Sequence, residues 1–436
     1  MENMKYAESL SKLIQVKTVT NIGDANFAQL RKVMENLFPN VHRVCERTQV
    51  FNNALLFKWT GKSNKKPIVL MGHQDVVPAD DGDWKYPPFD GVIADGRVWG
   101  RGAMDCKNTL FVSLQAIEEL ISEGFTPESD VYVASSDCEE TFGIGAPKIK
   151  DYLKNQGVKP FIVLDEGGAI LPEAFPGMIR PYAMVGVLEK GYGDVKFIAR
   201  SDGGHSSSPP KNTPVARLSK FITAVEDGNL FKKKMSPEAE EMLLAMADGL
   251  TGPLKFVLKH IKVFKPLVTK LLPKISPFGN ALFSTTMVFT MTSASPAPNV
   301  IPQEAYAIAN MRFAPHQGTK ACFETLEKLA KKYNLEMKII EGQDAHPPIS
   351  TKSAGYNYLT ANIKRCFPDI GIAPYVIMGG TDCRHFQDIC DCAMRFTPML
   401  YKPDQMAAMH ASNESVDIDT LGGGVRFMKE LILNNK

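Results

Sequence analysis

The sequence predicts an α/β protein in which a doubly wound, mostly parallel sheet forms a large domain, with a smaller ferredoxin-like α+β domain inserted into it. Three observations lead to this prediction. The chain has 436 residues, which is too long for one compact core and fits two domains. Buried strand patterns alternate with amphipathic helix patterns in its first part. A different order of elements begins near residue 189 and ends near residue 346.

The first part of the chain alternates helices with short apolar strands. We expect helices at 5–16, 26–38, 111–124 and 146–157, and strands at 54–59, 67–73, 131–137 and 161–167. The helix patterns have one apolar face, which is typical of helices that cover a sheet. The strands are nearly continuous apolar runs, and such runs indicate a sheet with helices on both faces.

The middle of the chain follows the order strand–helix–strand–strand–helix–strand, which is typical of a ferredoxin-like domain. The expected strands are 190–201, 284–294, 303–314 and 335–344, and the expected helices are 213–227 and 319–333. We therefore assign residues 1–188 and 347–436 to the large domain and residues 189–346 to the small one.

An additional insert of about residues 230–283 interrupts the small domain. No Asp or Glu occurs from Gly249 to Gln303, and the segment 254–275 is basic and amphipathic. Three interpretations fit: helices packed on the small domain or at a dimer contact, a wall for an apolar substrate tail, or a surface that binds membranes. We favour the first interpretation, and we expect Pro266 and Pro273 to interrupt the helix, which counts against membrane binding.

Composition excludes several classes of protein. The net charge of +2 does not indicate a nucleic-acid partner. The N-terminus lacks the basic start and apolar run of a signal peptide, and no apolar stretch of about 18 residues predicts a membrane span. Cys106 and Cys138 lie inside the motifs described next, which favours a reducing compartment. We therefore expect a cytoplasmic protein.

Side chains of the kinds that bind metal ions stand at the ends of the expected strands. His73 and Asp75 end one apolar run, Glu139 and Glu140 follow another, and Asp165 closes a third. In an open α/β sheet, ligands bind at the edge formed by the carboxyl ends of the strands. Imidazole and carboxylate groups suit zinc, cobalt or manganese. The sequence therefore predicts that these residues meet at a metal site.

Two further residues complete a set that could hold two metal ions. Asp105 lies in GRGAMDCK just before an expected helix, and His410 lies in MHASNE. Five ligands suffice for a pair of ions if one carboxylate bridges them. Position alone does not decide whether Asp165 or its neighbour Glu166 is the ligand.

Two acidic residues of this region are candidates for roles other than metal binding. Asp75 stands two residues after His73, so both side chains lie on the same face of an extended strand. Asp75 could then accept the free imidazole N–H and orient the ring. Glu139 stands beside the candidate ligand Glu140 and is free to act as a base.

The motifs resemble, in order and context, those of the zinc-dependent aminoacylase and carboxypeptidase family, the M20 metallopeptidases. The resemblance covers nearly the whole chain and is strongest for the branch with carboxypeptidase S (Gly-X carboxypeptidase) and the N-fatty-acyl-amino-acid hydrolases. It rests on GHQDVVPADDGDWKYPPFDG, GRGAMDCK, SSDCEETFG, LDEGG, GGHSS, NVIP, MRF, GGTDCRHF and MHASNE.

The resemblance implies a dinuclear site in the large domain, with zinc as the expected metal. His73 and Asp165 would hold one ion, Glu140 and His410 would hold the other, and Asp105 would bridge the two. The large domain would then be the catalytic domain, and the small domain would be a lid or dimerisation domain.

The resemblance also implies roles in catalysis and substrate binding. Glu139 would act as general base and then as acid. His205 would reach the active site of the partner subunit in a homodimer and stabilise the oxyanion. Asn299 and Arg312 would grip the substrate carboxylate, with Gly380 as a backbone contact beside it.

The implied reaction is hydrolysis of an amide bond next to a free carboxylate. The substrate would be a short peptide cut at its C-terminal end or an N-acyl amino acid. One alternative is a biosynthetic deacylase, such as a desuccinylase or deacetylase of a diamino acid. Another is a non-catalytic binding protein of the same fold. A serine hydrolase is disfavoured because no G-x-S-x-G motif occurs.

Overall fold

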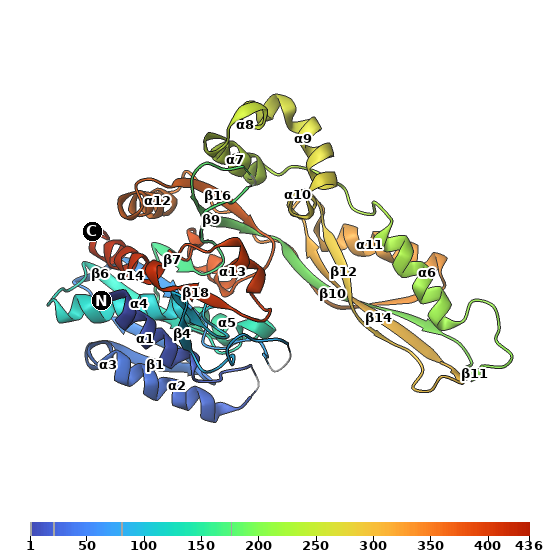
Figure 1. Ribbon diagram of the computed structural model, residues 1–436, viewed down its shortest axis with the longest axis horizontal. Coiled ribbons are helices and arrows are strands. Elements are labelled where there is room, and N and C mark those ends of the chain that lie inside the picture. Colours follow the sequence, from blue (N-terminus) through green and yellow to red (C-terminus); the bar gives the residue numbers. More distant parts are fainter. Residues whose placement is uncertain (1, 21, 80–81, 176) are drawn as a thin grey trace.

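The computed structural model describes residues 2–20, 22–79, 82–175 and 177–436. The chain forms a broad lobe that contains both termini and a narrower lobe that extends away from it (Figure 1). The broad lobe is built on the larger sheet, and the narrow lobe on a smaller one. This arrangement confirms the predicted fold class.

The large sheet has nine strands within the described residues, in the order β1-β2-β6-β3-β7-β17-β9-β16, with β8 paired to β9. β3 pairs in parallel with both β6 and β7, and β9 pairs in parallel with β16. The strands are β1 (Glu46–Phe51), β2 (Ala54–Trp59), β3 (Ser63–Met71), β6 (Ser129–Ser135), β7 (Ile162–Asp165), β8 (Ile170–Leu171), β9 (Tyr182–Glu189), β16 (Gly371–Ile377) and β17 (Ala393–Arg395).

Helices cover this sheet because its central strands are apolar on both faces. Every residue of β6, β7 and β9 is buried, as a sheet covered on both faces requires. α4 contacts β3 and β6, and α1 and α14 pack on α4. The helices of this lobe are α1 (Glu2–Ile14), α2 (Asp24–Leu37), α3 (Pro39–Val44), α4 (Lys107–Ser122), α5 (Gly145–Asn155), α12 (Ala354–Cys366), α13 (Pro403–Ala408) and α14 (Ile418–Leu433).

The small sheet has the strand order β12-β14-β10-β15, with α6 and α11 packed against it. Alternate residues of β14 are buried, so one face of the sheet meets the helices. The chain order strand–helix–strand–strand–helix–strand confirms the ferredoxin-like prediction. The elements are β10 (Gly191–Arg200), α6 (Pro214–Glu226), β12 (Thr286–Ser293), β14 (Glu304–Phe313), α11 (Gly318–Lys332) and β15 (Glu336–Gln343).

The chain crosses between the two sheets at two places. β9 ends at Glu189 and β10 begins at Gly191, so Lys190 alone separates the large sheet from the small one. The return lies between β15 and α12. The predicted limits at 188/189 and 346/347 fall at these crossings. The division into two separate domains stays a prediction.

The insert of residues 230–283 packs differently from what we expected. It contains α7 (Pro237–Met246), α8 (Gly252–Lys259), α9 (Ile261–Ile275) and α10 (Pro277–Phe283). α7 contacts β16 and β9, and Met242, Met246 and Leu258 belong to the core of the large lobe. The expected packing on the small domain is therefore wrong. The insert covers β16, whose outer edge would otherwise be unpaired.

The two prolines of the insert do not end the helix that contains them. α9 runs through both Pro266 and Pro273. The predicted interruption is therefore wrong, because each proline removes only one N–H from the helical hydrogen bonds and the rest of the helix persists. Over the described ranges, none of the helices is both long and apolar enough to cross a lipid bilayer.

Two small ladders complete the structure. β18 (Ser415–Asp417), β5 (Arg97–Trp99) and β4 (Val92–Ala94) form a sheet beside the large one. β11 (Gly204–His205) pairs with β13 (Val300–Ile301) at the far end of the narrow lobe (Figure 1).

Candidate metal centre

The carboxyl ends of three neighbouring strands bring the predicted ligands together. His73 follows the end of β3, and Glu139 and Glu140 open a short 3-10 helix, η1 (Glu139–Thr141), after β6. Asp165 is the last residue of β7. Because β3 is hydrogen-bonded to both β6 and β7, these ends meet at one edge of the sheet, as the sequence indicated.

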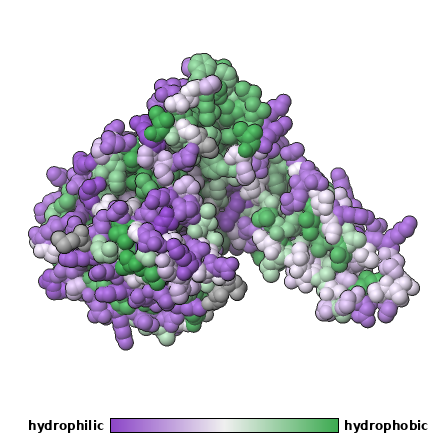
Figure 2. All heavy atoms as spheres, viewed as in Figure 1, coloured by the Kyte–Doolittle hydropathy of each residue, from purple (hydrophilic) through white to green (hydrophobic). Residues whose placement is uncertain are grey.

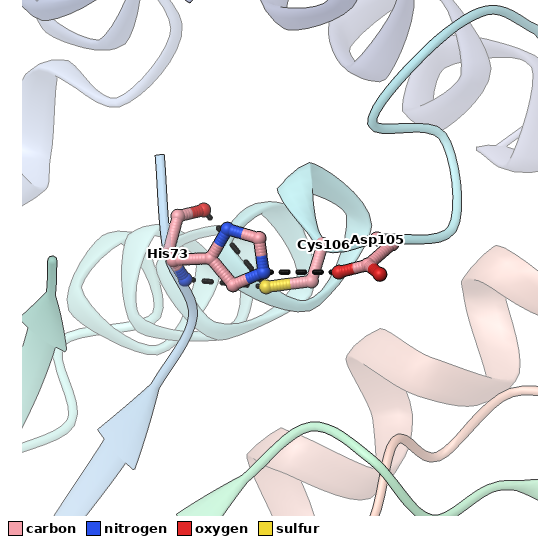
Figure 3. A group of neighbouring side chains, drawn as sticks. All are labelled: His73, Asp105 and Cys106. Carbon is pink, nitrogen blue, oxygen red and sulfur yellow. Dashed lines mark hydrogen bonds and ion pairs between the residues drawn. The ribbon is translucent and has the colours of Figure 1, made fainter. Parts of the chain in front are cut away.

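Asp105 lies between two imidazoles. Its Oδ1 lies 2.9 Å from His73 Nε2, and its Oδ2 lies 3.0 Å from His410 Nε2. Figure 3 shows the His73 ring pointing at the Asp105 carboxylate, with Cys106 beside it. One oxygen for each histidine is the disposition expected of a carboxylate that bridges two ions.

Two groups of potential ligands share Asp105. In the described part of the chain, ligand atoms within 4.8 Å of one another come from Asp105, Glu140 and His410, and from His73, Asp105 and Cys106. His410 Nε2 lies 3.1 Å from Glu140 Oε2, and Glu140 Oε1 is buried without a hydrogen-bond partner. Imidazole and carboxylate donors with a free buried oxygen fit divalent metal ions such as zinc.

The ionisation of these groups indicates a site made for cations. Hydrogen bonds to Asp105 and Glu140 raise the pKa of His410 to about 10. Burial raises the pKa of Glu140. Burial also opposes ionisation of Asp105, but the hydrogen bonds from His410 and His73 hold its pKa well below the usual range. The surrounding carboxylates therefore favour positive charge at this point, as a site for divalent cations requires.

Asp165 and Glu166 both lie at the edge of this cluster. Asp165 is 3% exposed, and its two oxygens accept the backbone N–H groups of Cys383 at 2.8 Å and Glu166 at 2.9 Å. It belongs to neither ligand group among the described residues. Burial, followed by the charges of Asp105 and Asp165, raises the pKa of Glu166 well above its usual range. The assignment of Asp165 as a ligand stays a prediction.

Asp75 connects the His73 strand end to the Glu139–Glu140 turn. His73 Nδ1 lies 2.9 Å from the Asp75 carbonyl oxygen but 3.4 Å from Asp75 Oδ1. The carbonyl is therefore the closer partner of the ring, where we expected the carboxylate. The carboxylate instead accepts the backbone N–H groups of Glu139 and Glu140 at 3.1 and 3.2 Å and the Thr20 hydroxyl at 2.7 Å.

Glu139 lies beside the cluster with an unusually basic carboxylate. Burial raises its pKa well above the usual range, and Asp382 and Glu166 raise it further, while His73 opposes them. A carboxylate with a raised pKa is a stronger base, as general base catalysis requires. The position of Glu139 agrees with the role that the resemblance implied.

The loop that carries Asp105 depends on two glycines. Gly100 and Gly102 have φ angles of 146° and 89°, which other residues rarely adopt. A Cβ on Gly100 would lie 2.5 Å from Ile14 Cγ2, and one on Gly102 would lie 2.9 Å from Val76 Cγ1. The two glycines of the GRGAMD motif therefore allow a backbone conformation that residues with a Cβ atom at these positions would not permit.

Glu414 holds the same loop, and the sequence analysis assigned it no role. Its Oε1 accepts backbone N–H groups of Gly102, Met104 and Asp105 at 3.1, 2.8 and 3.1 Å. Its Oε2 accepts the Arg101 guanidinium at 2.7 Å. Glu414 is the last residue of the MHASNE motif, which also contains His410. Its place in that motif is the sequence feature that could have indicated a role at the site.

Arg312 lies near Phe142 where the two lobes join, and Gly380 lines a small pocket together with the same ring. The Arg312 guanidinium lies 4.9 Å from the Tyr192 ring centre and 6.0 Å from that of Phe142, which follows η1. Its Nη1 is buried without a hydrogen-bond partner. A Cβ on Gly380 would lie 3.1 Å from Arg384 Nη1, and the Arg384 guanidinium lies 5.3 Å from Phe142. Two cations therefore flank one ring beside Glu139.

His205 and Asn299 lie together at the far end of the narrow lobe (Figure 1). Both are exposed, and the Asn299 carbonyl accepts the Ser206 N–H at 3.0 Å. His205 Nδ1 lies 2.9 Å from the Ser207 hydroxyl. Within one chain, Asn299 therefore lies apart from Arg312, although we expected both side chains to bind the same substrate carboxylate.

Comparisons with known proteins agree with this geometry. The chain matches the family described as Peptidase family M20/M25/M40 over residues 69–434. It is 31% identical to probable carboxypeptidase S-like 2 of Dictyostelium discoideum, covering 100% of this chain and 86% of that protein. It is 30% identical to the human N-fatty-acyl-amino acid synthase/hydrolase PM20D1, covering 99% and 88%. The M20 family metallo-carboxypeptidase Sso-CP2 from Sulfolobus solfataricus has a similar fold, with a TM-score of 0.69, 19% identity and coverage of 98% of both chains.

Proposed function

The chain belongs to peptidase family M20/M25/M40, and on that premise we propose that it is a two-zinc hydrolase that cleaves an amide bond next to a free carboxylate. The observation that supports this most directly is Asp105, which offers one carboxylate oxygen to His73 and the other to His410. A carboxylate in that position serves two ions at once.

The proposed metal ligands divide into two sets around Asp105. His73 and Asp165 would complete one site, and Glu140 and His410 would complete the other. Zinc suits these donors, and cobalt or manganese could replace it. When bound, such a pair lowers the pKa of a water molecule and polarises the substrate carbonyl.

Glu139 would move the proton of the reaction. Its raised pKa allows the carboxylate to accept a proton from the attacking water and later donate it to the leaving amine. Asp75 supports this role because its carboxylate accepts the Glu139 N–H at 3.1 Å and so orients the turn.

Arg312 would recognise the free carboxylate of the substrate. Its buried Nη1 lacks a hydrogen-bond partner and can donate to an anionic ligand. Gly380 would allow the backbone of its loop to approach the same group. Two cations at this point, Arg312 and Arg384, support a substrate that carries a negative charge close to the scissile bond.

His205 and Asn299 would act on the active site of a second subunit. Both are exposed at the end of the narrow lobe, apart from the metal ligands of their own chain. A homodimer in which this end reaches the partner's cluster would supply His205 to the oxyanion. We also propose a cytoplasmic location, which the eight free cysteines support.

Two substrate classes are supported by the names of the relatives. One relative is called carboxypeptidase S-like and another N-fatty-acyl-amino acid synthase/hydrolase. Both names describe amides next to a carboxylate. A biosynthetic deacylase of a diamino acid is less well supported, because the branch with these relatives matches almost the full chain. The complete set of ligands and base argues against a non-catalytic protein.

The test is release of free amino acid from a panel of N-acyl amino acids and Gly-X dipeptides, with the methyl ester of each as a matched control. We expect activity that needs both metal and the free carboxylate. Equal hydrolysis of acids and esters would contradict the proposed role of Arg312. Absence of release across the panel, from protein shown to hold two metals, would contradict the proposed substrate class.

A further inference from the structure

The outward face of α9 carries a continuous apolar stripe. Val263, Leu267, Leu271 and Ile275 follow one another at intervals of four residues, so they lie in one row along the helix. Their exposed fractions are 75%, 47%, 45% and 79%. Phe256 on α8 is 56% exposed. Figure 2 shows hydrophobic residues gathered over α8 and α9 at the top of the molecule.

This stripe is separate from the side of the helix that packs on the protein. Ile261 and Leu272 are the buried residues of α9, and both belong to the core of the large lobe. The helix is therefore already anchored by its inner side. An exposed apolar surface next to a satisfied core contact indicates an interaction site.

Lysines border the stripe on the same helix. Lys262, Lys270 and Lys274 are exposed, and among the described residues no carboxylate lies within ion-pair distance of them. Two nearby acidic groups are already paired: Glu240 lies 2.6 Å from Lys265, and Asp248 lies 2.9 Å from Lys259. No acidic residue occurs between Gly249 and Gln303 to offset this charge.

An open groove runs alongside the lysines. Its volume is about 460 Å³, and Lys233 and Lys234 line it together with Lys265, Lys270 and Lys274 of α9. Ammonium groups from two segments thus surround one depression. This arrangement suits an array of phosphate or carboxylate groups better than a single small anion.

We propose that the face formed by α8 and α9 docks on an anionic lipid bilayer. The apolar stripe would enter the boundary between headgroups and acyl chains, and the lysines would contact the headgroups, as in interfacial amphipathic helices. The charge selects this occupant. In a symmetric contact with a second copy the same patch meets itself, so the lysines would face lysines. A wall for a bound substrate would not leave Val263 and Ile275 so exposed.

The test is flotation of the full-length wild-type protein with vesicles. Vesicles of phosphatidylcholine alone are compared with vesicles of about three parts phosphatidylserine to seven parts phosphatidylcholine. We expect co-flotation with the anionic vesicles only, and loss of binding when the salt is raised from about 0.1 M to 1 M. Absence of co-flotation with anionic vesicles at low salt would overturn the proposal without any variant.

Two variants separate the contributions of charge and apolar contact. Lys262→Glu/Lys270→Glu/Lys274→Glu should lower the partition coefficient by more than about a hundredfold, since each lysine near an anionic surface contributes about fivefold and each glutamate adds repulsion. Val263→Ser/Leu271→Ser/Ile275→Ser should also lower it, with the salt dependence retained. The residues are exposed, so the thermal unfolding midpoint should remain that of the wild type.

The matched control is Lys320→Glu/Lys328→Glu/Lys332→Glu on α11, which makes the same charge change on the small lobe. We expect this control to bind vesicles nearly as the wild type does. An equal loss in the control would overturn the proposal, because binding would then follow net charge alone. A stripe variant that floats normally but changes from dimer to monomer in light scattering would also overturn it, in favour of a second copy as occupant.

Discussion

The metal-ligand cluster and the far end of the narrow lobe contain the two halves of one candidate active site, and they differ in the burial of most of their residues, although His410 of the cluster is exposed. His73 and Asp105 are 3% and 9% exposed, and buried hydrogen bonds orient their side chains. His205 and Asn299 are exposed and rest on a two-residue ladder. Under the proposed function, one chain is therefore sufficient to bind metal, while turnover needs a second copy.

The comparison predicts that changes in the two regions have separate effects. Substitutions that disturb the cluster should change metal content, whereas substitutions at the end of the narrow lobe should change turnover only. Glu139 is the informative exception, because it lies in the cluster but is not proposed to bind metal.

Glu139→Gln should have the largest effect on turnover. Loss of a general base lowers kcat by about 10²–10⁴-fold, and the amide keeps the size of the side chain. Bound metal, measured by elemental analysis, should remain that of the wild type. Near-normal turnover would contradict the base role, and loss of metal would show that Glu139 is itself a ligand.

His205→Ala should lower kcat by about 10²–10³-fold, the usual cost of removing an oxyanion donor, without loss of metal. His316→Ala, which changes another histidine of the small lobe, is the control. Mixed dimers of His205→Ala with Glu139→Gln should regain activity, up to about one quarter of wild type for random pairing of two subunits. No recovery in mixed dimers would contradict action across subunits.

Glu414→Gln should weaken metal binding by about 10–100-fold, as is typical for residues that support metal ligands. The amide cannot accept hydrogen bonds with both of its ends, so the Asp105 loop loses part of its support. Titration with a chelator measures the change. His205→Ala serves as the matched variant from the other region, and an equal effect of both on metal affinity would remove the distinction between the regions.

Lys190→Met, at the crossing between the two lobes, should have the smallest effect, which is a change in how the free energy of unfolding depends on pH. Burial, followed by the charge of Arg312, lowers the pKa of Lys190 to about 7. An unfolded lysine has a pKa of about 10.4, so between these values the unfolded chain holds the proton and the folded chain does not. The free energy of unfolding should therefore rise with pH across this window.

The variant should lose part of that rise, on the order of 1 kcal/mol between neutral pH and about pH 9. Urea unfolding at both pH values measures it. Burial also lowers the pKa of Lys107 to about 7. Lys107 is present in both proteins, so its contribution to the pH dependence cancels when the two are compared. A variant with the same pH dependence as the wild type would contradict the lowered pKa of Lys190.

Local pattern was sufficient to predict many individual elements. The expected strand at 54–59 coincides with β2, and the expected helix at 26–38 differs from α2 by two residues at its start and one at its end. Such segments carry their periodicity within their own sequence. The pattern did not reveal α3 or the sheet of β4, β5 and β18, because these elements are only three to six residues long.

A long-range contact explains why the predicted packing of the insert was wrong, and a local detail decided a second feature. The apolar and basic pattern of 254–275 predicted an amphipathic helix, but nothing in the pattern showed that α7 of the same insert packs on β16, which comes more than a hundred residues later in the chain. The partner of the His73 ring depended on a difference of 0.5 Å between two oxygens of Asp75, at 2.9 and 3.4 Å. No spacing in the sequence encodes a distance of that size.

The sequence by itself determined the fold class and the identity of the candidate metal ligands, because strand ends and motif residues are local properties. The tertiary structure decided which of them meet. It brought Asp105 between His73 and His410 across more than three hundred residues of chain, and it gave Glu414 a role by closing a loop around it. It also separated His205 and Asn299 from the cluster, since the length and direction of the narrow lobe depend on packing rather than on pattern.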